Sequence, residues 1–231
     1  MNLKEKLNQV PLVKTWKRIQ LKKQFRGSLQ YWEDRYQSKG NSGTGSYTHL
    51  AEFKAEILNN FVTTNNINRV IEFGCGDGNQ LTRAKYPEYI GLDVSPTAIK
   101  ICADLFRDDH AKSFYLYDTL AFQDNCRLFQ ADLVLSLDVL FHLVEQEIFE
   151  TYIRHLFDAS TKYVIIYASD FNQNDDAVYQ HDKRRNFTTY VEKNIPGWKL
   201  KEVVYNKYPV EKYKEKGSLS DFYIYEKAEG R

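Results

Sequence analysis

The feature of this sequence that most constrains its fold is an apolar run that contains an acid and leads into three alternating glycines. Residues 70–73 read as a strand that contains Glu72. Gly74, Gly76 and Gly78 follow at alternate positions. A strand that ends in a glycine-rich turn and reopens as a helix gathers backbone N–H groups at one point, and glycine lets a ligand approach them. The stretch predicts a cofactor-binding turn in an α/β domain, although a plain strand–turn–helix could also produce it.

A dinucleotide fingerprint is one alternative for this turn. That fingerprint, G-x-G-x-x-G, would require a third glycine at position 79, where this chain has Asn79. Residues 89–93 read as the next strand and end in Asp93, about 20 residues beyond the first glycine. A carboxylate at that place can accept hydrogen bonds from ribose hydroxyls. It suits a dinucleotide as well as any other adenosine cofactor.

Length and composition predict a single soluble globular domain. The chain has 231 residues, of which 42% are hydrophobic and 27% charged. Its net charge of +1 gives no overall attraction to nucleic acid. The three cysteines form no C-x-x-C pair, and we find no membrane span and no secretory signal. These features favour a cytoplasmic protein.

Residues 1–26 are basic and could form an amphipathic helix after Pro11. Leu12, Trp16 and Ile19 recur at helical spacing among lysines and arginines. Such a helix can lie on a membrane surface or meet an acidic partner. It can equally pack on the main domain with its basic face in water.

Residues 31–47 are candidates for a lid over the cofactor. Tyr31 and Arg35 lie in an aromatic and charged stretch, with Arg35 expected to face a carboxylate, and a glycine- and serine-rich loop follows. An aromatic anchor and an ordinary linker are the alternative. Ser46 or Thr48 could cap the next helix.

Strands and helices alternate along the rest of the chain, which predicts a doubly wound α/β sheet. The inward stripe of the helix before the first strand is expected at Leu50, Phe53, Ile57 and Phe61. Strands are expected at 68–73, 89–93, 113–117, 131–137, 162–167, 198–205 and 221–225, and helices at 78–86, 96–106, 145–157 and 187–191. We divide the chain into a helical cap and lid at 1–62 and a core at 63–231, in one structural domain.

The order E-x-G-x-G-x-G, Asp93, Asp118 and Asp138 resembles the core of class I S-adenosylmethionine (SAM)-dependent methyltransferases across about residues 66–170. The resemblance implies a Rossmann-like sheet of seven mostly parallel strands. It implies SAM as the cofactor, with S-adenosylhomocysteine (SAH) as the product. By position, Asp93 would bind the ribose, Asp118 with Thr119 the adenine, and Asp138 would lie near the sulfonium. The full set of implied cofactor residues is Tyr31, Arg35, Glu72, Gly74, Cys75, Gly76, Gly78, Asn79, Gln80, Asp93, Val94, Ser95, Asp118, Thr119 and Asp138.

Flanking stretches resemble a subgroup associated with bacterial surface polysaccharides. They include residues 31–36, 138–143 and 181–187. The proposed relatives include methyltransferases for the capsule O-methyl phosphoramidate group. This resemblance implies O-methylation of a small anionic or sugar-linked acceptor.

Candidate catalytic and acceptor-binding residues follow from position and chemistry. His142 and His181 are candidate bases, since an oxygen acceptor must lose its proton. His142 could instead be packed under a helix start, and the cationic patch around His181 could be a solvated charge run. The expected acceptor-binding residues are Ser46, Tyr47, Phe141, His181, Arg184 and Arg185. No metal site is expected, because the histidines show no ligand spacing.

Two rival functions remain open. One is a non-catalytic SAM- or dinucleotide-binding module. The other is an RNA methyltransferase, which the basic residues 1–26 would suit. A nucleobase amino-methyltransferase usually carries D/N-P-P-Y/F after the fourth strand, whereas residues 138–141 here lack proline.

Overall fold

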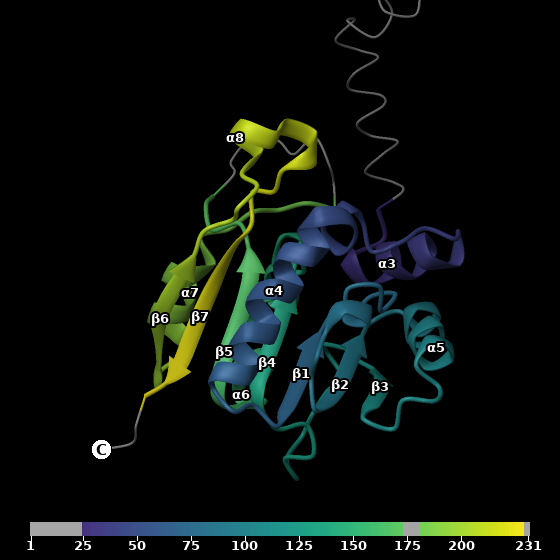
Figure 1. Cartoon of the computed structure of the whole chain (residues 1–231), viewed down its shortest axis with the longest axis horizontal. Helices are drawn as coiled ribbons and strands as arrows, with labels where there is room; N and C mark the ends of the chain where they lie inside the picture. The colour runs from purple at the N-terminus through teal and green to yellow at the C-terminus, as the bar shows by residue number, and fades with distance from the viewer. Residues whose placement is uncertain (1–24, 173–180, 229–231) are drawn as a thin grey trace, which may run out of the picture.

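A seven-stranded sheet forms the centre of the chain (Figure 1). The computed structural model describes residues 25–172 and 181–228. The strand order is β3-β2-β1-β4-β5-β7-β6. The strands are β1 (Arg69–Phe73), β2 (Glu88–Asp93), β3 (Lys112–Leu116), β4 (Ala131–Leu137), β5 (Ser160–Ala168), β6 (Trp198–Val204) and β7 (Asp221–Lys227).

The sheet is parallel except for β7, which lies between β5 and β6. β1 to β5 pair in parallel, whereas β7 runs antiparallel to both β5 and β6. This confirms the predicted Rossmann-like sheet. Strand order reverses between β1 and β4, and sheets of this type bind ligands at the carboxyl ends of the strands beside such a switch.

Helices cover both faces of the sheet. α4 (Thr48–Thr64) and α5 (Pro96–Leu105) pack on one face, and α6 (Gln146–Asp158) and α7 (Phe187–Asn194) on the other (Figure 1). β1 shows why: successive strand residues point to opposite faces, so Val70 joins the core under α4 and Ile71 the core under α6. Both side chains are fully buried.

Short elements gather at the carboxyl ends of the strands. α3 (Ser28–Gln37) crosses above β1 and β2, and α8 (Val210–Tyr213) projects from the β6–β7 connection (Figure 1). The 3₁₀ turns are η1 (Thr44–Ser46), η2 (Leu81–Arg83), η3 (Leu140–His142) and η4 (Lys214–Lys216). No helix in the described ranges is long and apolar enough to cross a membrane.

The predicted helix at 78–86 is wrong, because only the turn η2 forms there. The side chain of Asn59 in α4 explains the early end of this turn. Its Nδ2 donates to the Arg83 carbonyl and its Oδ1 accepts from the Lys85 N–H. Backbone groups that would have continued a helix are thereby bound to α4, and Ala84 is extended.

The start of α4 also differs from the prediction. Tyr47 is the N-cap residue and makes no side-chain cap, so neither Ser46 nor Thr48 serves as one. The inward stripe includes the fully buried Lys54 and Leu58. The predicted basic helix lies almost entirely within residues 1–24, outside the described residues.

Candidate active site

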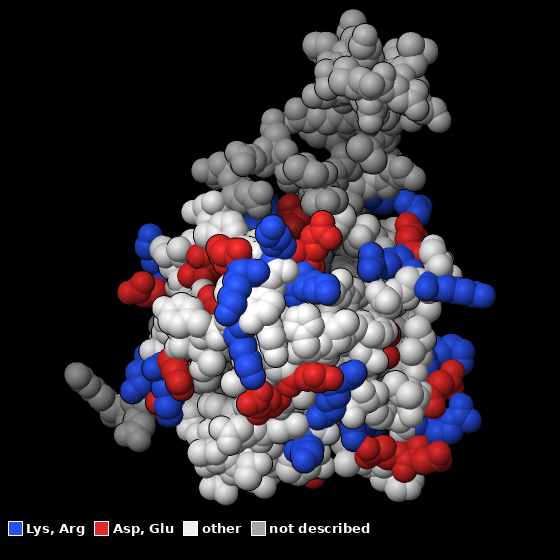
Figure 2. Space-filling model, turned by 45° about the horizontal axis from the view of Figure 1, so that its top comes forward, with Lys and Arg blue, Asp and Glu red and all other residues white. Residues whose placement is uncertain are grey.

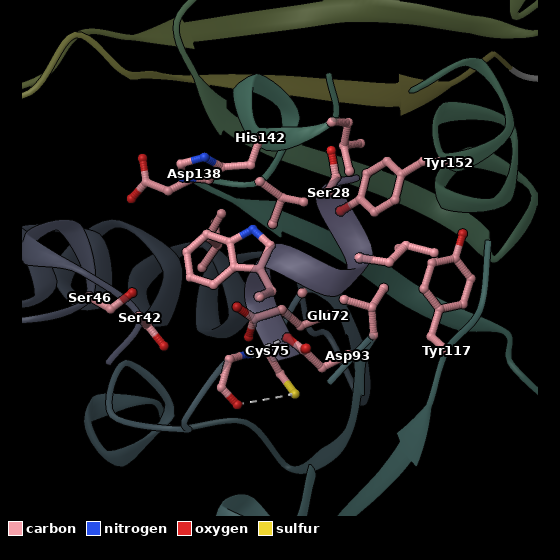
Figure 3. A pocket seen from close by; sticks show the side chains of 18 of the residues that line it. Ser28, Ser42, Ser46, Glu72, Cys75, Asp93, Tyr117, Asp138, His142 and Tyr152 are labelled. Carbon is pink, nitrogen blue, oxygen red and sulfur yellow. Dashed lines mark hydrogen bonds between the residues drawn. The ribbon is translucent and has the colours of Figure 1, made fainter. Parts of the chain in front are cut away.

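A cavity opens at the carboxyl ends of β1 and β4, beneath α3 (Figure 3). Together with the open solvent at its mouth, it encloses about 780 Å³ of empty space. Of the predicted site residues, it is lined by Ser46, Glu72, Gly74, Cys75, Gly76, Gln80, Asp93, Val94, Thr119, Asp138 and His142. The fold thus brings most of the predicted cofactor-binding residues together at one cavity.

The glycine turn forms the floor of this cavity. Gly74, Gly76 and Gly78 all have positive φ, at 83°, 58° and 75°, where a side chain would be strained. A Cβ on Gly76 would lie 2.3 Å from the Ser42 hydroxyl, and one on Gly74 would lie 2.4 Å from the Val139 side chain. The turn is therefore packed closely against the side chains of Ser42 and Val139, which only glycine permits.

Asp93 braces the turn from the end of β2. Its carboxylate accepts the N–H groups of Gly76 and Ser95, each at 2.9 Å. Burial raises its pKa to about 6 in spite of these bonds. Each carboxylate oxygen can accept two hydrogen bonds, so the carboxylate retains capacity for a ligand hydroxyl at the cavity wall.

Glu72 is a second buried acid in the wall. It is 4% exposed and accepts a hydrogen bond from the Tyr89 hydroxyl at 2.8 Å. Burial raises its pKa to about 7, partly opposed by the Tyr89 hydrogen bond and by the nearby Lys54 ammonium. Near neutral pH this group can hold or release a proton, and a cation in the cavity would favour its charged form.

Two buried polar atoms in the wall have no hydrogen-bond partner among the described residues. These are Gln80 Oε1 and Thr119 Oγ1. Buried polar atoms are normally satisfied, and unpaired ones cost roughly 1–3 kcal/mol each. A polar ligand would satisfy them, so the wall fits a cofactor that carries amino, hydroxyl and adenine groups, as SAM does.

The stretch from α3 to η1 forms the roof of the cavity. Ser42 donates its N–H to Asp77 and accepts from the Asp77 N–H through its hydroxyl, at 2.9 and 3.0 Å. Tyr47 donates to the same carboxylate, and Asn79 donates to the Ser46 carbonyl. The predicted lid segment is thus bonded directly to the glycine turn.

α3 is held at two places by acids. Glu33 accepts from Thr97 and from the hydroxyl of Ser95, which itself caps α5. Glu145, before α6, accepts the N–H and hydroxyl of Ser28 at 2.9 and 2.6 Å. The Ser95 hydroxyl is therefore occupied by protein groups. Ser95 therefore anchors the roof, and its role in cofactor binding stays a prediction.

Asp138 begins the loop after β4 in a left-handed conformation, with φ of 59°. Its Oδ2 lies 2.8 Å from the Lys54 ammonium, and its Oδ1 accepts from the Ser220 hydroxyl at 3.0 Å. Figure 3 shows Asp138 next to His142 and on the same side of the cavity as Ser42 and Ser46, with Tyr117 and Tyr152 on the opposite side. Non-glycine residues in this conformation are uncommon and gather at functional sites.

Sequence reasoning missed Lys54. The signal was present, because Lys54 lies four residues after Leu50 and four before Leu58, on the inward face of α4. A lysine among buried apolar residues indicates a buried acid that pairs with it.

His142 lines the same end of the cavity. Its Nδ1 lies 3.1 Å from the carbonyl oxygen of His181, and its ring meets Trp32 edge-on at 4.9 Å. A carbonyl can only accept, so Nδ1 carries the proton and Nε2 presents a lone pair. Burial lowers the pKa of His142, which keeps the ring neutral.

The remaining predicted residues lie around the cavity and do not line it. Tyr31 stacks on His181 at 4.3 Å, and Arg35 donates to the Asn41 carbonyl and lies over Trp32. These contacts place both on the outer side of the roof. Asp118 is exposed and accepts the Leu120 N–H.

The two arginines differ in their environment. Arg184 pairs with Asp182 at 2.9 Å and lies over the ring of Phe141. Arg185 donates to the carbonyls of Leu143 and Val144 at 2.7 and 2.8 Å. Its guanidinium therefore supports the start of α6, and its role in acceptor binding stays a prediction.

Comparison with known proteins agrees with this geometry. Residues 71–161 match the family model described as a methyltransferase domain. No curated protein sequence matches the chain.

Several solved structures share the fold at low sequence identity. The N-methyltransferase NodS from Bradyrhizobium japonicum WM9, in complex with SAH, has a TM-score of 0.64 at 15% identity and covers 88% of this chain and 100% of that chain. Magnesium protoporphyrin IX methyltransferase from Synechocystis PCC 6803, with bound SAM, scores 0.60 at 15% identity and covers 88% and 99%. The small RNA methyltransferase HEN1 scores 0.61 at 18% identity and covers 80% of this chain and 26% of that chain.

The matched domain contains the glycine turn, Asp93 and Asp138, which meet at the cavity. The unpaired polar atoms in the cavity wall could bond to polar groups of SAM. From the domain match and the site geometry together, we conclude that the chain is a SAM-dependent methyltransferase.

Proposed function

We propose that the enzyme methylates an oxygen of a small anionic or sugar-linked acceptor, with His142 as the proton acceptor. The hydrogen bond between His142 Nδ1 and the His181 carbonyl carries this proposal. It fixes the tautomer in which Nε2 is basic, at the end of the cavity where Asp138 lies. A general base is needed for hydroxyl acceptors and contributes roughly 10²–10⁴-fold.

The chain's own residues would hold the cofactor along the cavity. Glu72 and the glycine turn would bind its amino-acid part, Asp93 its ribose hydroxyls, and Thr119 its adenine side. Asp138 would face the sulfonium. When bound, the cofactor supplies an electrophilic methyl group, and the protein's main task is to align the acceptor with the C–S bond.

His142 would then manage the proton. The acceptor hydroxyl would give its proton to Nε2 as its oxygen takes the methyl group that SAM would supply, with SAH as the leaving group. The resulting imidazolium keeps its Nδ1–H bond to the His181 carbonyl, and its lowered pKa favours release of the proton to water.

We further propose that the acceptor belongs to bacterial surface-polysaccharide synthesis, as in the capsule, and could be a phosphoramidate. The resemblance of residues 31–36, 138–143 and 181–187 supports this substrate class. Arg184, beside Phe141 at the histidine end, is the candidate cation for an anionic acceptor.

An RNA acceptor is the second candidate, because the fold is shared with HEN1 and residues 1–26 are basic. Figure 2 favours the small acceptor. Among the described residues in that view, Lys and Arg are interspersed with Asp and Glu. An extended basic stripe would be expected for a long nucleic acid.

The test is a methyl-transfer screen with labelled SAM against nucleotide sugars, phosphorylated small molecules and RNA. We expect the labelled methyl group only in a small acceptor, bound to oxygen as a methyl ether or a methyl ester. Label in RNA would overturn the small-acceptor proposal, and label on nitrogen would remove the reason for a base.

A further inference from the structure

Lys54 is the most deeply buried charged side chain beside the cavity. It projects from α4 and is 0% exposed. Its ammonium meets the Asp138 carboxylate at 2.8 Å and lies 5.3 Å from the ring centre of Tyr167. Burial of an ammonium costs several kcal/mol unless a carboxylate compensates it. The chain therefore holds this charge at some cost, next to a residue that lines the cavity.

The pair also limits where Asp138 can point. Lys54 and Ser220 each hold one oxygen of its carboxylate. Gly45, in the roof, lies close to the same carboxylate: a Cβ at that position would lie 2.5 Å from Asp138 Oδ2, so only glycine fits there. The carboxylate is thus held by α4 and by the end of the β6–β7 connection.

The charge of Lys54 reaches the cavity as well. It lowers the pKa of Glu72, another acid of the wall, so its field acts on both carboxylates. The two forms of the cofactor differ in charge at one atom: the sulfur is cationic in SAM and neutral in SAH. A buried cation behind Asp138 opposes the attraction of that carboxylate for a sulfonium.

We propose that Lys54 is a positioning residue that holds Asp138 at the sulfonium end of the cavity and sets how strongly the site distinguishes SAM from SAH. This rests on the cofactor placement proposed above. With the pair intact, the two charges nearly cancel at the sulfur. The site then binds SAH and SAM with similar affinity. With Lys54 removed, the uncompensated Asp138 would favour SAM.

The experiment measures the dissociation constants of SAM and SAH by titration calorimetry. The proteins are the wild type, Lys54→Met, Asp138→Asn and the double variant. We expect the ratio of the SAH to the SAM constant to rise about tenfold in Lys54→Met. It should fall in Asp138→Asn and return to within about twofold of wild type in the double variant. Lys100→Met, an exposed lysine of α5, is the matched control and should leave the ratio unchanged.

A purely structural Lys54 would give a different result. It could weaken the binding of both ligands to Lys54→Met, but the ratio in that variant would equal the wild-type ratio, and that outcome overturns the proposal. Asp138→Asn leaves an unpaired buried ammonium and could fail to fold. In that case Lys54→Met against the double variant decides alone. A wild type that binds neither SAM nor SAH would contradict the cofactor placement and not the role of Lys54.

Discussion

Replacement of Glu72 by glutamine should make the empty protein more stable at neutral and higher pH, and make it bind SAM more weakly. Glu72 has a folded-state pKa of about 7 against an ordinary value of 4.5, chiefly because it is buried. An acid whose pKa is raised on folding contributes its full stability below 4.5, and loses it as pH rises through about 7. The shift corresponds to about 3 kcal/mol in total. Between pH 5 and pH 8 the wild type should lose about 2 to 3 kcal/mol that the variant keeps.

The assay is urea unfolding of the cofactor-free protein at pH 5, 6, 7 and 8. The free energy of unfolding of Glu72→Gln minus that of the wild type should grow with pH across this range, at unchanged m-value. Taking the difference removes other groups that titrate there, such as Asp93. Glu52→Gln, an exposed glutamate of α4, is the control and should run parallel to the wild type.

The same acid should make SAM binding depend on pH. A cationic ligand favours the ionised carboxylate, so binding should release a proton, and the affinity of the wild type should rise between pH 6 and pH 8. Glu72→Gln should bind more weakly and lose that part of the pH dependence. Parallel stability curves for the two proteins, or an unchanged affinity profile, would refute the reasoning.

Four further predictions concern the proposed site. Asp93→Ala should weaken SAM binding by roughly 1–3 kcal/mol, since charge-assisted bonds to the ribose are lost; equal affinity by calorimetry would contradict the ribose assignment. Amide exchange in residues 31–47 should slow when SAM or SAH is added, and equal exchange with and without ligand would make this stretch a static roof. His142→Ala should lower kcat, less so at high pH where the acceptor ionises without help; full kcat at every pH would make the histidine structural. Arg184→Ala should raise KM for the acceptor and spare SAM affinity, and an unchanged KM would remove the anion site.

Local sequence patterns predicted the sheet well because the spacing of apolar residues in a strand depends on whether one or both of its faces are buried. The nearly continuous apolar run at Ala131–Leu137 predicted β4 with its observed bounds. Ser95 and Pro96 marked the start of α5, where the Ser95 side chain accepts the Ala98 N–H. The helix expected after Gly78 failed for a non-local reason. Asn59, about twenty residues earlier, binds the backbone that such a helix would need.

The site shows the same division between local and distant causes. The three alternating glycines were readable because each needs a positive φ, which is a property of its own backbone. The attachment of the roof was not readable, since Glu145 lies 117 residues from the Ser28 that it holds. Arg184 and Arg185 are adjacent in sequence, yet one pairs with an acid and the other with carbonyls at the start of α6. Charge pattern alone gives no basis for telling such neighbours apart.

The buried acids of the cavity lower the stability of the ligand-free protein, and ligand binding should offset this loss. Glu72 and Asp93 both carry raised pKa values because their burial disfavours the charged form. An empty site pays for this in stability, and two wall atoms, Gln80 Oε1 and Thr119 Oγ1, add unpaired polar groups. A ligand with a cation, hydroxyls and an amino group would compensate both buried carboxylates and would supply hydrogen-bond partners for both unpaired atoms. The stabilisation that SAM gives should therefore shrink when either acid is made neutral, and Lys54 determines how much of it the neutral product retains.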